Sequence, residues 1–192
     1  MLIAIEGIDG SGKTTIAKYL RNVLKEMGYK VVLFKEPTDS VYGKKIKQFL
    51  NNRLDAEEEL ELFILDRKYD VEKNILPALE KNYIVIMDRY YYSTIAYQGA
   101  RGIDVDKIKA MNEKIAPKPD LVLILDVNPE VGIKRIRNRG DKPNKFEGLE
   151  YLKAVRNIFL KLKNKNIVIV DANRSKEEVK KEVLNIVKSL IT

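Results

Sequence analysis

GIDGSGKT, residues 7–14, is the stretch that decides the fold. It matches the pattern G-x-x-x-x-G-K-[ST] in full, follows an apolar run over 2–6 and opens a helical pattern over 13–27. Its glycines allow the backbone to wrap around a phosphate, and the following helix adds its positive N-terminal end. The stretch therefore predicts a triphosphate-binding loop in which Lys13 binds the β- and γ-phosphates and the Thr14 hydroxyl binds Mg²⁺. The residues assigned to this loop are Gly7, Ile8, Asp9, Gly10, Ser11, Gly12, Lys13, Thr14 and Thr15.

Short apolar runs alternate with amphipathic stretches along the whole chain. The runs have almost continuously apolar interiors, as in parallel strands buried on both faces, and cover residues 2–6, 30–34, 83–87, 121–127 and 167–170. The patterns between them predict helices over 13–27, 40–51, 56–81, 91–98, 105–114, 129–138, 149–162 and 175–190. Pro77 should kink or divide the third helix. The alternation predicts an α/β fold with a doubly wound parallel sheet and a ligand at the carboxyl ends of its strands.

Length and composition narrow the chemistry. A chain of 192 residues suits a single domain, 1–192. It has no cysteine and no histidine, which excludes disulfides, thiolate or imidazole metal sites and His-based catalysis. Carboxylates, lysine, arginine, hydroxyls and a hard, oxygen-bound metal such as Mg²⁺ remain. No apolar run is long enough to span a bilayer and residues 1–6 lack a basic signal-peptide region, so we expect a cytoplasmic protein.

The net charge of +8 is unevenly distributed. Residues 128–192 hold 16 basic and 8 acidic side chains, which accounts for the whole surplus. Such a segment favours an anionic partner, which could be a nucleic acid, a polyphosphate or a membrane surface. Solvated helix faces would explain the same excess without any partner.

Other motifs discriminate between classes of P-loop protein. A GTPase needs Asn/Thr-Lys-x-Asp to read the base, and the closest string, residues 164–167, lacks the aspartate. At the end of the third apolar run, Asp88 is placed to serve as the Mg²⁺ partner, or else to cap the next helix. Arg89 follows it and could bind a phosphate bidentately or form a surface ion pair. These features favour a kinase over a switch.

Together with the loop, three further strings resemble the thymidylate kinase (dTMP kinase) family over nearly the whole chain. They are FKEP at 34–37, LF with DR at 62–67, and DRYYYSTIAYQG at 88–99, followed by the arginines 135, 137 and 139 in a basic segment. The resemblance implies a P-loop kinase-type three-layer α/β/α sandwich with a five-stranded parallel sheet and a lid over about 135–147. It also implies the reaction ATP + dTMP → ADP + dTDP in dTTP biosynthesis, with Mg²⁺ and a homodimer.

The resemblance further implies how the acceptor nucleotide is held. Asp9 would bind the sugar 3′-hydroxyl, and Arg89 the 5′-phosphate. Phe63 and Arg67, which share a helix face, would stack on thymine and bond its carbonyl edge. Tyr97 would fill the space of a ribose 2′-hydroxyl. Ser93 and Gln98 would turn toward the base, although residues of these types more often belong to helix surfaces or packing, and Phe63 could equally be a core aromatic.

Two departures from the family pattern concern arginines. Gly10 stands where one subgroup has a catalytic arginine, so the chain follows the subgroup that carries it in the lid. Arg135 and Arg139 share a helix face and are the better candidates, with Arg137 rotated away. Residues 38 and 39 are Thr and Asp where some members carry a phosphate-binding arginine, and Lys35 could substitute for it without the bidentate fork. The predicted catalytic residues are Lys13, Arg89, Arg135 and Arg139.

Three other functions are compatible with parts of the sequence. Another nucleoside monophosphate kinase, acting on dUMP, UMP or CMP, is the closest, because base choice rests on the resemblance. A P-loop switch would lack an acceptor site. A nucleic-acid binder would use the basic segment, but no recognisable nucleic-acid module is present. We therefore expect the small nucleotides ATP and dTMP as partners, and neither a nucleic acid nor a membrane.

Overall fold

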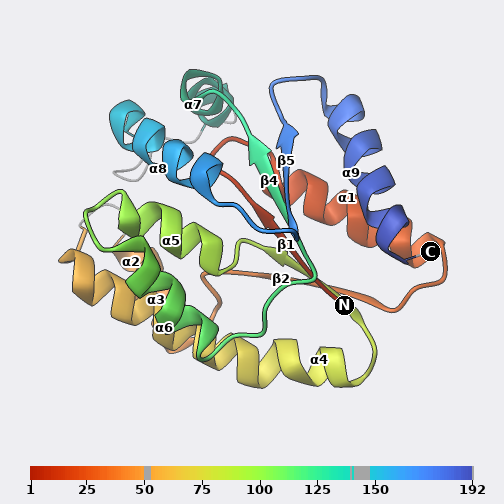
Figure 1. Ribbon diagram of the computed structural model, residues 1–192, viewed down its shortest axis with the longest axis horizontal. Coiled ribbons are helices and arrows are strands. Elements are labelled where there is room, and N and C mark those ends of the chain that lie inside the picture. The colour runs from red at the N-terminus through yellow and green to blue at the C-terminus, as the bar shows by residue number, and fades with distance from the viewer. Residues whose placement is uncertain (50–52, 139, 141–147, 192) are drawn as a thin grey trace.

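A single sheet of five parallel strands forms the centre of the molecule (Figure 1). The structure is a computed structural model that describes residues 1–49, 53–138, 140 and 148–191. The strands are β1 (Leu2–Glu6), β2 (Val31–Lys35), β3 (Ile84–Asp88), β4 (Leu121–Asp126) and β5 (Ile167–Asp171). Their order in the sheet is β2-β3-β1-β4-β5, so β1 lies between β3 and β4. The loop after β1 therefore begins where the strand order reverses, the usual ligand position in such sheets.

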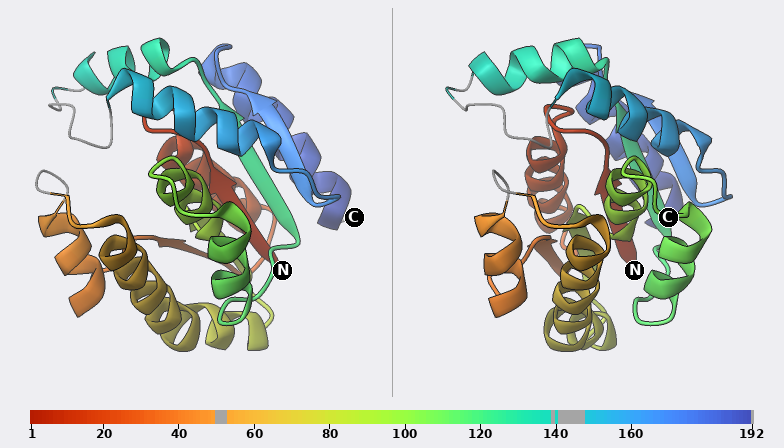
Figure 2. Two further views of the ribbon diagram at one scale, coloured as in Figure 1. Left: turned by 60° about the vertical axis from the view of Figure 1, so that its left-hand side comes forward. Right: turned by 90° about the vertical axis from the view of Figure 1, so that its left-hand side faces the viewer.

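Helices cover both faces of this sheet. They are α1 (Lys13–Glu26), α2 (Val41–Gln48), α3 (Ala56–Asp70), α4 (Leu76–Glu80), α5 (Tyr91–Gly99), α6 (Val105–Glu113), α7 (Pro129–Asn138), α8 (Leu149–Lys161) and α9 (Lys176–Ile191). Figures 1 and 2 show α1 and α9 together on one side of the sheet and α3, α5 and α8 on the other. This confirms the predicted three-layer α/β/α sandwich.

The core explains why the central strands read as apolar runs. Every residue of β1 and β3 is buried, because helices pack on both faces of these strands. The two charged residues among them, Glu6 and Asp88, are the last of their strands and face the functional end of the sheet. No helix in the described part of the chain has the length and apolar character needed to cross a membrane.

The predicted third helix, 56–81, is divided as Pro77 required. After α3, the wide turn η1 (Val71–Ile75) adopts π-helical hydrogen bonding and leads into α4, where Pro77 is the second residue. Proline has no backbone N–H, and its ring would collide with the carbonyl four residues earlier in a regular α-helix. A widened turn removes that collision.

Two strands lie one residue later than predicted, and this shift matters for the site. β2 ends at Lys35 and β3 at Asp88, and these two residues are register partners. Both therefore project from the carboxyl edge of the sheet beside the loop after β1. The predicted helix over 40–51 ends at Gln48, and residues 50–52 lie outside the described part.

Candidate active site

The loop between β1 and α1 is closed around the side chain of Lys13. Its ammonium donates to the carbonyl oxygens of Gly7 at 3.0 Å and Ile8 at 2.8 Å, and the residue is only 6% exposed. Burial lowers the pKa of Lys13 to about 8, and the positive charge of Arg89 adds to this effect. A bound polyanion would counter both causes, so the loop is electrostatically suited to phosphate.

Thr14 and Asp88 bring hard oxygen atoms to the start of α1. The Thr14 hydroxyl donates to Asp88 Oδ2 at 2.5 Å, and Lys35 Nζ lies 4.0 Å from the same oxygen. Asp88 Oδ1 is buried and has no hydrogen-bond partner among the described residues. Mg²⁺ in kinases takes one or two protein oxygens and completes its shell with phosphates and water, so this pair fits it. No cluster of three or more metal-ligating side chains occurs in the described part of the chain.

The loop touches α7 through two glycines. Gly10 has a φ of +80°, and a Cβ added there would lie 2.2 Å from the carbonyl oxygen of Gly132. A Cβ added at Gly132 would lie 2.6 Å from the carbonyl oxygen of Asp9. The two backbones are therefore in direct contact, and an arginine side chain at position 10 has no room.

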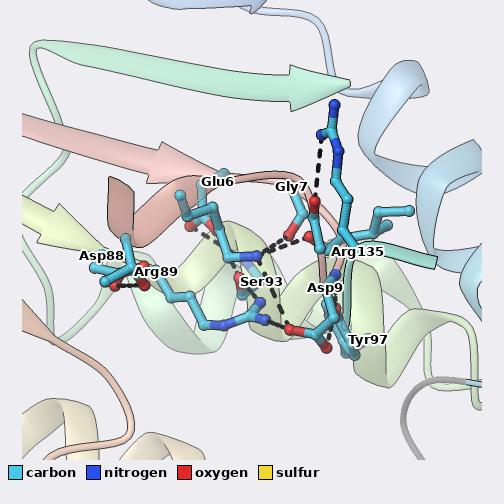
Figure 3. Close-up of polar contacts among 12 residues, drawn as sticks. Glu6, Gly7, Asp9, Asp88, Arg89, Ser93, Tyr97 and Arg135 are labelled. Carbon is cyan, nitrogen blue, oxygen red and sulfur yellow. Dashed lines mark hydrogen bonds and ion pairs between the residues drawn. The ribbon is translucent and has the colours of Figure 1, made fainter. Parts of the chain in front are cut away.

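An arginine reaches the same place from α7. Arg135 donates to the carbonyl oxygen of Gly10 at 3.4 Å (Figure 3). It also donates to the carbonyl oxygen of Ala172 at 3.0 Å. It also lines a cavity of about 330 Å³ on the α1 side of the loop, together with Gly12, Thr15 and Arg174. Arg137 is exposed, whereas Arg139 and residues 141–147 of the expected lid lie outside the described residues.

Asp9, Arg89 and Tyr97 form a compact polar group beside the loop (Figure 3). The Arg89 guanidinium pairs with Asp9 Oδ1, donates to Ser93 Oγ at 3.1 Å and lies 5.2 Å from the centre of the Tyr97 ring. The Tyr97 hydroxyl donates to Asp9 Oδ2 at 2.9 Å. Burial alone would raise the pKa of Asp9, but the charges of Arg89 and Lys13 outweigh it and hold the pKa below its usual value.

Glu6 supports the Asp9–Arg89–Tyr97 group through Ser93 and the start of α5. The sequence predicted no role for it. Its buried carboxylate accepts the backbone N–H groups of Tyr90 at 2.8 Å and Ser93 at 3.2 Å, and the Ser93 hydroxyl at 2.5 Å. It thus anchors the start of α5 and holds Ser93 against Arg89. Burial raises the pKa of Glu6 to about 7, although the hydrogen bond from Ser93 and the charge of Arg89 oppose it. A charged residue ending an apolar strand was the available signal.

A cavity of about 760 Å³ opens from this group toward β2, α2 and α3. Six predicted acceptor residues line it, namely Asp9, Lys35, Phe63, Arg89, Ser93 and Tyr97. Phe63 is half-buried and belongs to the cavity wall rather than to the hydrophobic core. The cavity wall also includes Thr94 and Glu36, which the sequence analysis did not single out.

Arg67 lies behind this wall instead of in it. It is 1% exposed and donates to Thr94 Oγ1 at 3.1 Å, to Asn112 and to Glu36. Burial raises the pKa of Glu36 to about 8, against the opposing charge of Arg67. Thr94, which accepts from Arg67 and also lines the cavity, therefore lies between Arg67 and the cavity.

Gln98 is not brought to the cavity. Its side chain is fully buried, and Nε2 donates to Glu59 Oε2 at 2.9 Å. This placement does not agree with the prediction that Gln98 turns toward the base. The reason is the buried carboxylate of Glu59 on α3, which accepts from the Gln98 amide. Helical geometry alone does not explain the placement, because Gln98 is four residues after the cavity-lining Thr94.

Comparisons with known proteins agree with this arrangement. The family model described as "Thymidylate kinase" matches residues 5–183. The chain is 58% identical over 191 residues to a "Probable thymidylate kinase" of Archaeoglobus fulgidus, covering 100% of this chain and 96% of that protein. It is 46% and 47% identical over 180 residues to proteins named "Thymidylate kinase" from Xanthomonas campestris and Xanthomonas oryzae, covering 93% of this chain and 79% of each relative. With a P-loop, an adjoining acceptor-sized cavity and these matches, the chain belongs to the thymidylate kinase family.

Proposed function

We propose that the chain transfers the γ-phosphoryl group of ATP to dTMP, giving ADP and dTDP. The observation that carries this proposal is the meeting of two compartments at Asp9 and Arg89. Asp9 belongs to the phosphate-binding loop, and both residues line the cavity of about 760 Å³. A donor phosphate held by the loop and an acceptor held in the cavity would face each other there, as in-line transfer requires.

On the donor side, the loop backbone and Lys13 hold the phosphates of ATP. Thr14 and Asp88 hold Mg²⁺, which supplies neutralising charge on the donor phosphates. Arg135 enters beside Gly10 and stabilises charge on the transferred group. Arg139, expected to act with it, lies outside the described residues.

On the acceptor side, Arg89 binds the 5′-phosphate and Lys35 adds a second positive charge at the same edge of the sheet. Phe63 stacks on the base, and Thr94, which accepts a hydrogen bond from Arg67, directs its own hydroxyl proton at a base carbonyl. Asp9 accepts a hydrogen bond from the sugar 3′-hydroxyl. Tyr97, which donates to Asp9, occupies the space that the 2′-hydroxyl of a ribose would need.

The reaction needs no base from the protein. An acceptor phosphate oxygen attacks the γ-phosphorus, a new P–O bond forms, and the bond to the bridging oxygen of ADP breaks. The attacking phosphate is already anionic, so the absence of histidine is no obstacle. The main barrier is the repulsion between two polyanions, which Lys13, Arg89 and Arg135 offset.

We also propose a cytoplasmic homodimer. The support is that Leu65, Tyr69 and Leu76 are 40%, 41% and 40% exposed along α3 and the start of α4, where these apolar side chains could pack against a second copy. Sedimentation at micromolar concentration tests this: a monomer would contradict the proposal, and Leu65→Lys should weaken a dimer.

The test of function is ADP release in the presence of dTMP, dUMP, UMP, CMP, AMP or GMP as acceptor. We expect the highest kcat/KM with dTMP, and a clear preference over UMP, which lacks the methyl group and carries the 2′-hydroxyl. Preference for UMP or CMP would favour another nucleoside monophosphate kinase. ADP release that no monophosphate stimulates would favour a P-loop switch.

A further inference from the structure

A buried ion cluster lies beside the last turn of α5. Its centre is Glu59, which is 2% exposed and accepts from Arg53 at 2.9 Å, from Arg101 at 2.8 Å and from Gln98 at 2.9 Å. These partners come from the segment before α3, from the turn after α5 and from α5 itself. One carboxylate therefore ties α3 to the end of α5, and two arginines leave the cluster with a net positive charge.

Tyr151 connects this cluster to α8. Its hydroxyl accepts from Arg53 Nη2 at 3.2 Å, and the Arg53 guanidinium lies 4.8 Å from the centre of its ring. The helices themselves touch closely, since a Cβ added at Gly99 would lie 2.7 Å from a methyl of Val105 and 3.1 Å from one of Ile158 on α8.

The same hydroxyl donates to the backbone carbonyl of Tyr97 at 2.6 Å. This carbonyl belongs to the last turn of α5, where helical carbonyls lose their regular partners. The N–H groups that follow α5 donate to its neighbours instead: Ala100 to Ala96, Arg101 to Gln98, and Gly102 to Gly99. Tyr151 thus supplies a donor to the one residue of that turn whose side chain faces the acceptor cavity.

Tyr97 is consequently held at both ends. Tyr151 binds its backbone and lies edge-on to its ring, with ring centres 6.1 Å apart and planes at 72°. The Tyr97 hydroxyl makes two hydrogen bonds with Asp9: it donates to Oδ2 and accepts from the backbone N–H at 3.1 Å. A displacement of α8 against α5 would therefore reach the phosphate-binding loop through one side chain.

We infer that Tyr151, seated on the Glu59 cluster, is a positioning residue that sets Tyr97 against the sugar of the acceptor nucleotide. Gln98 belongs to this support rather than to the base site. The inference rests on the proposed function, specifically on Tyr97 standing beside the sugar. It assigns to Tyr151 an effect on sugar discrimination that a residue serving only the stability of the fold would not have.

The test compares Tyr151→Phe with Tyr97→Phe and with Tyr19→Phe. The last is a matched control, because it removes the same hydroxyl from α1, where the ring contacts Lys180. The acceptors are dTMP and ribothymidine 5′-monophosphate, which differ only by the 2′-hydroxyl. For Tyr151→Phe we expect KM for dTMP to rise about tenfold, as loss of one buried hydrogen bond implies, and the preference for the deoxy sugar to fall. KM for ATP should stay within about twofold, as should all constants of Tyr19→Phe.

The outcomes separate the two levels of the argument. If Tyr97→Phe alters sugar preference and Tyr151→Phe alters only the melting temperature, the positioning role is wrong and the assignment of Tyr97 stands. If neither variant alters sugar preference, both are wrong. If Tyr151→Phe does not fold, Arg53→Lys breaks the Arg53–Tyr151 contact while keeping the charge beside Glu59. It should shift KM for dTMP and the sugar preference in the same direction, and unchanged values would overturn the inference.

Discussion

Replacing Gly10 with alanine would put a methyl group where the backbone of Gly132 now lies. The added Cβ would be 2.2 Å from the carbonyl oxygen of Gly132 and 2.6 Å from its carbonyl carbon and Cα, all rigid backbone atoms. The loop and α7 would have to separate by roughly 1 Å to restore normal contact, and overpacking of this kind costs about 1–3 kcal/mol. A φ of +80° adds about 1–2 kcal/mol for any residue with a Cβ. The expected loss of stability is therefore about 2–5 kcal/mol.

Two further variants separate the two contributions. Gly28→Ala has a φ of +90° but no described atom within 4 Å of the new Cβ, so it should cost only the backbone strain, about 1–2 kcal/mol. Gly132→Ala lies within helix α7 and has no positive φ, and the Asp9 carbonyl oxygen at 2.6 Å is the one neighbour closer than ordinary contact. It should cost the collision, about 1–3 kcal/mol, less up to about 1 kcal/mol by which a helix favours alanine over glycine.

Urea unfolding at equilibrium, without nucleotide, measures all three variants on one scale. Gly10→Ala should be the most destabilised of the three variants. Its loss of unfolding free energy should reach at least about the sum of the losses of the other two. If Gly10→Ala were no less stable than Gly28→Ala, the loop and α7 would not be in contact. The explanation for the absence of an arginine at position 10 would then be wrong.

Three other changes test the site. Arg135→Ala should lower kcat by about 10³-fold or more, because Arg135 reaches the loop. Arg137 is exposed and does not, so Arg137→Ala should change kcat little. Equal effects of the two variants in steady-state assays would contradict this. Phe63→Ala should raise KM for dTMP at least about fivefold through lost stacking and leave KM for ATP unchanged. Burial raises the pKa of Glu6 from 4.5 to about 7, so its contribution to stability is full below pH 4.5 and is lost as the pH rises through 7. The unfolding free energy should therefore fall between pH 4.5 and 7 by up to about 3 kcal/mol less in Glu6→Gln than in the unmodified protein. An identical fall in both proteins, measured by urea titration, would refute the raised pKa of Glu6.

The sequence was sufficient for the architecture because its signals are local. Apolar runs and the phosphate-binding motif specify the strands, and the missing N–H of Pro77 specifies where a helix must widen. The one-residue shift of β2 and β3 could not be predicted, because it depends on pairing between strands that are far apart in the chain. That pairing places Lys35 opposite Asp88.

The acceptor residues were predictable where spacing defines a face. Ser93 and Tyr97 are four residues apart on α5 and both line the cavity, whereas Gln98, four residues after the cavity-lining Thr94, joins the Glu59 cluster. Helical spacing alone does not separate Gln98 from the cavity-lining residues, because Gln98 and Thr94 share a helix face. The Glu59 cluster could not be predicted from the sequence, because only the tertiary fold brings its members together. They come from α3, α5 and α8, from the segment before α3 and from the turn after α5.

The proposed role of Arg135 illustrates how a packing contact can decide where a positive charge is placed. Gly10 and Gly132 let the loop and α7 meet backbone to backbone, and that contact brings the first turns of α7 against the P-loop. An arginine three residues further along α7, at position 135, then lies on the same face and reaches the Gly10 carbonyl. A side chain at position 10 would have separated the two segments and moved Arg135 away. The position of Arg135 therefore depends on a glycine at position 10. Moving the arginine from α7 to the loop would require both backbones to move.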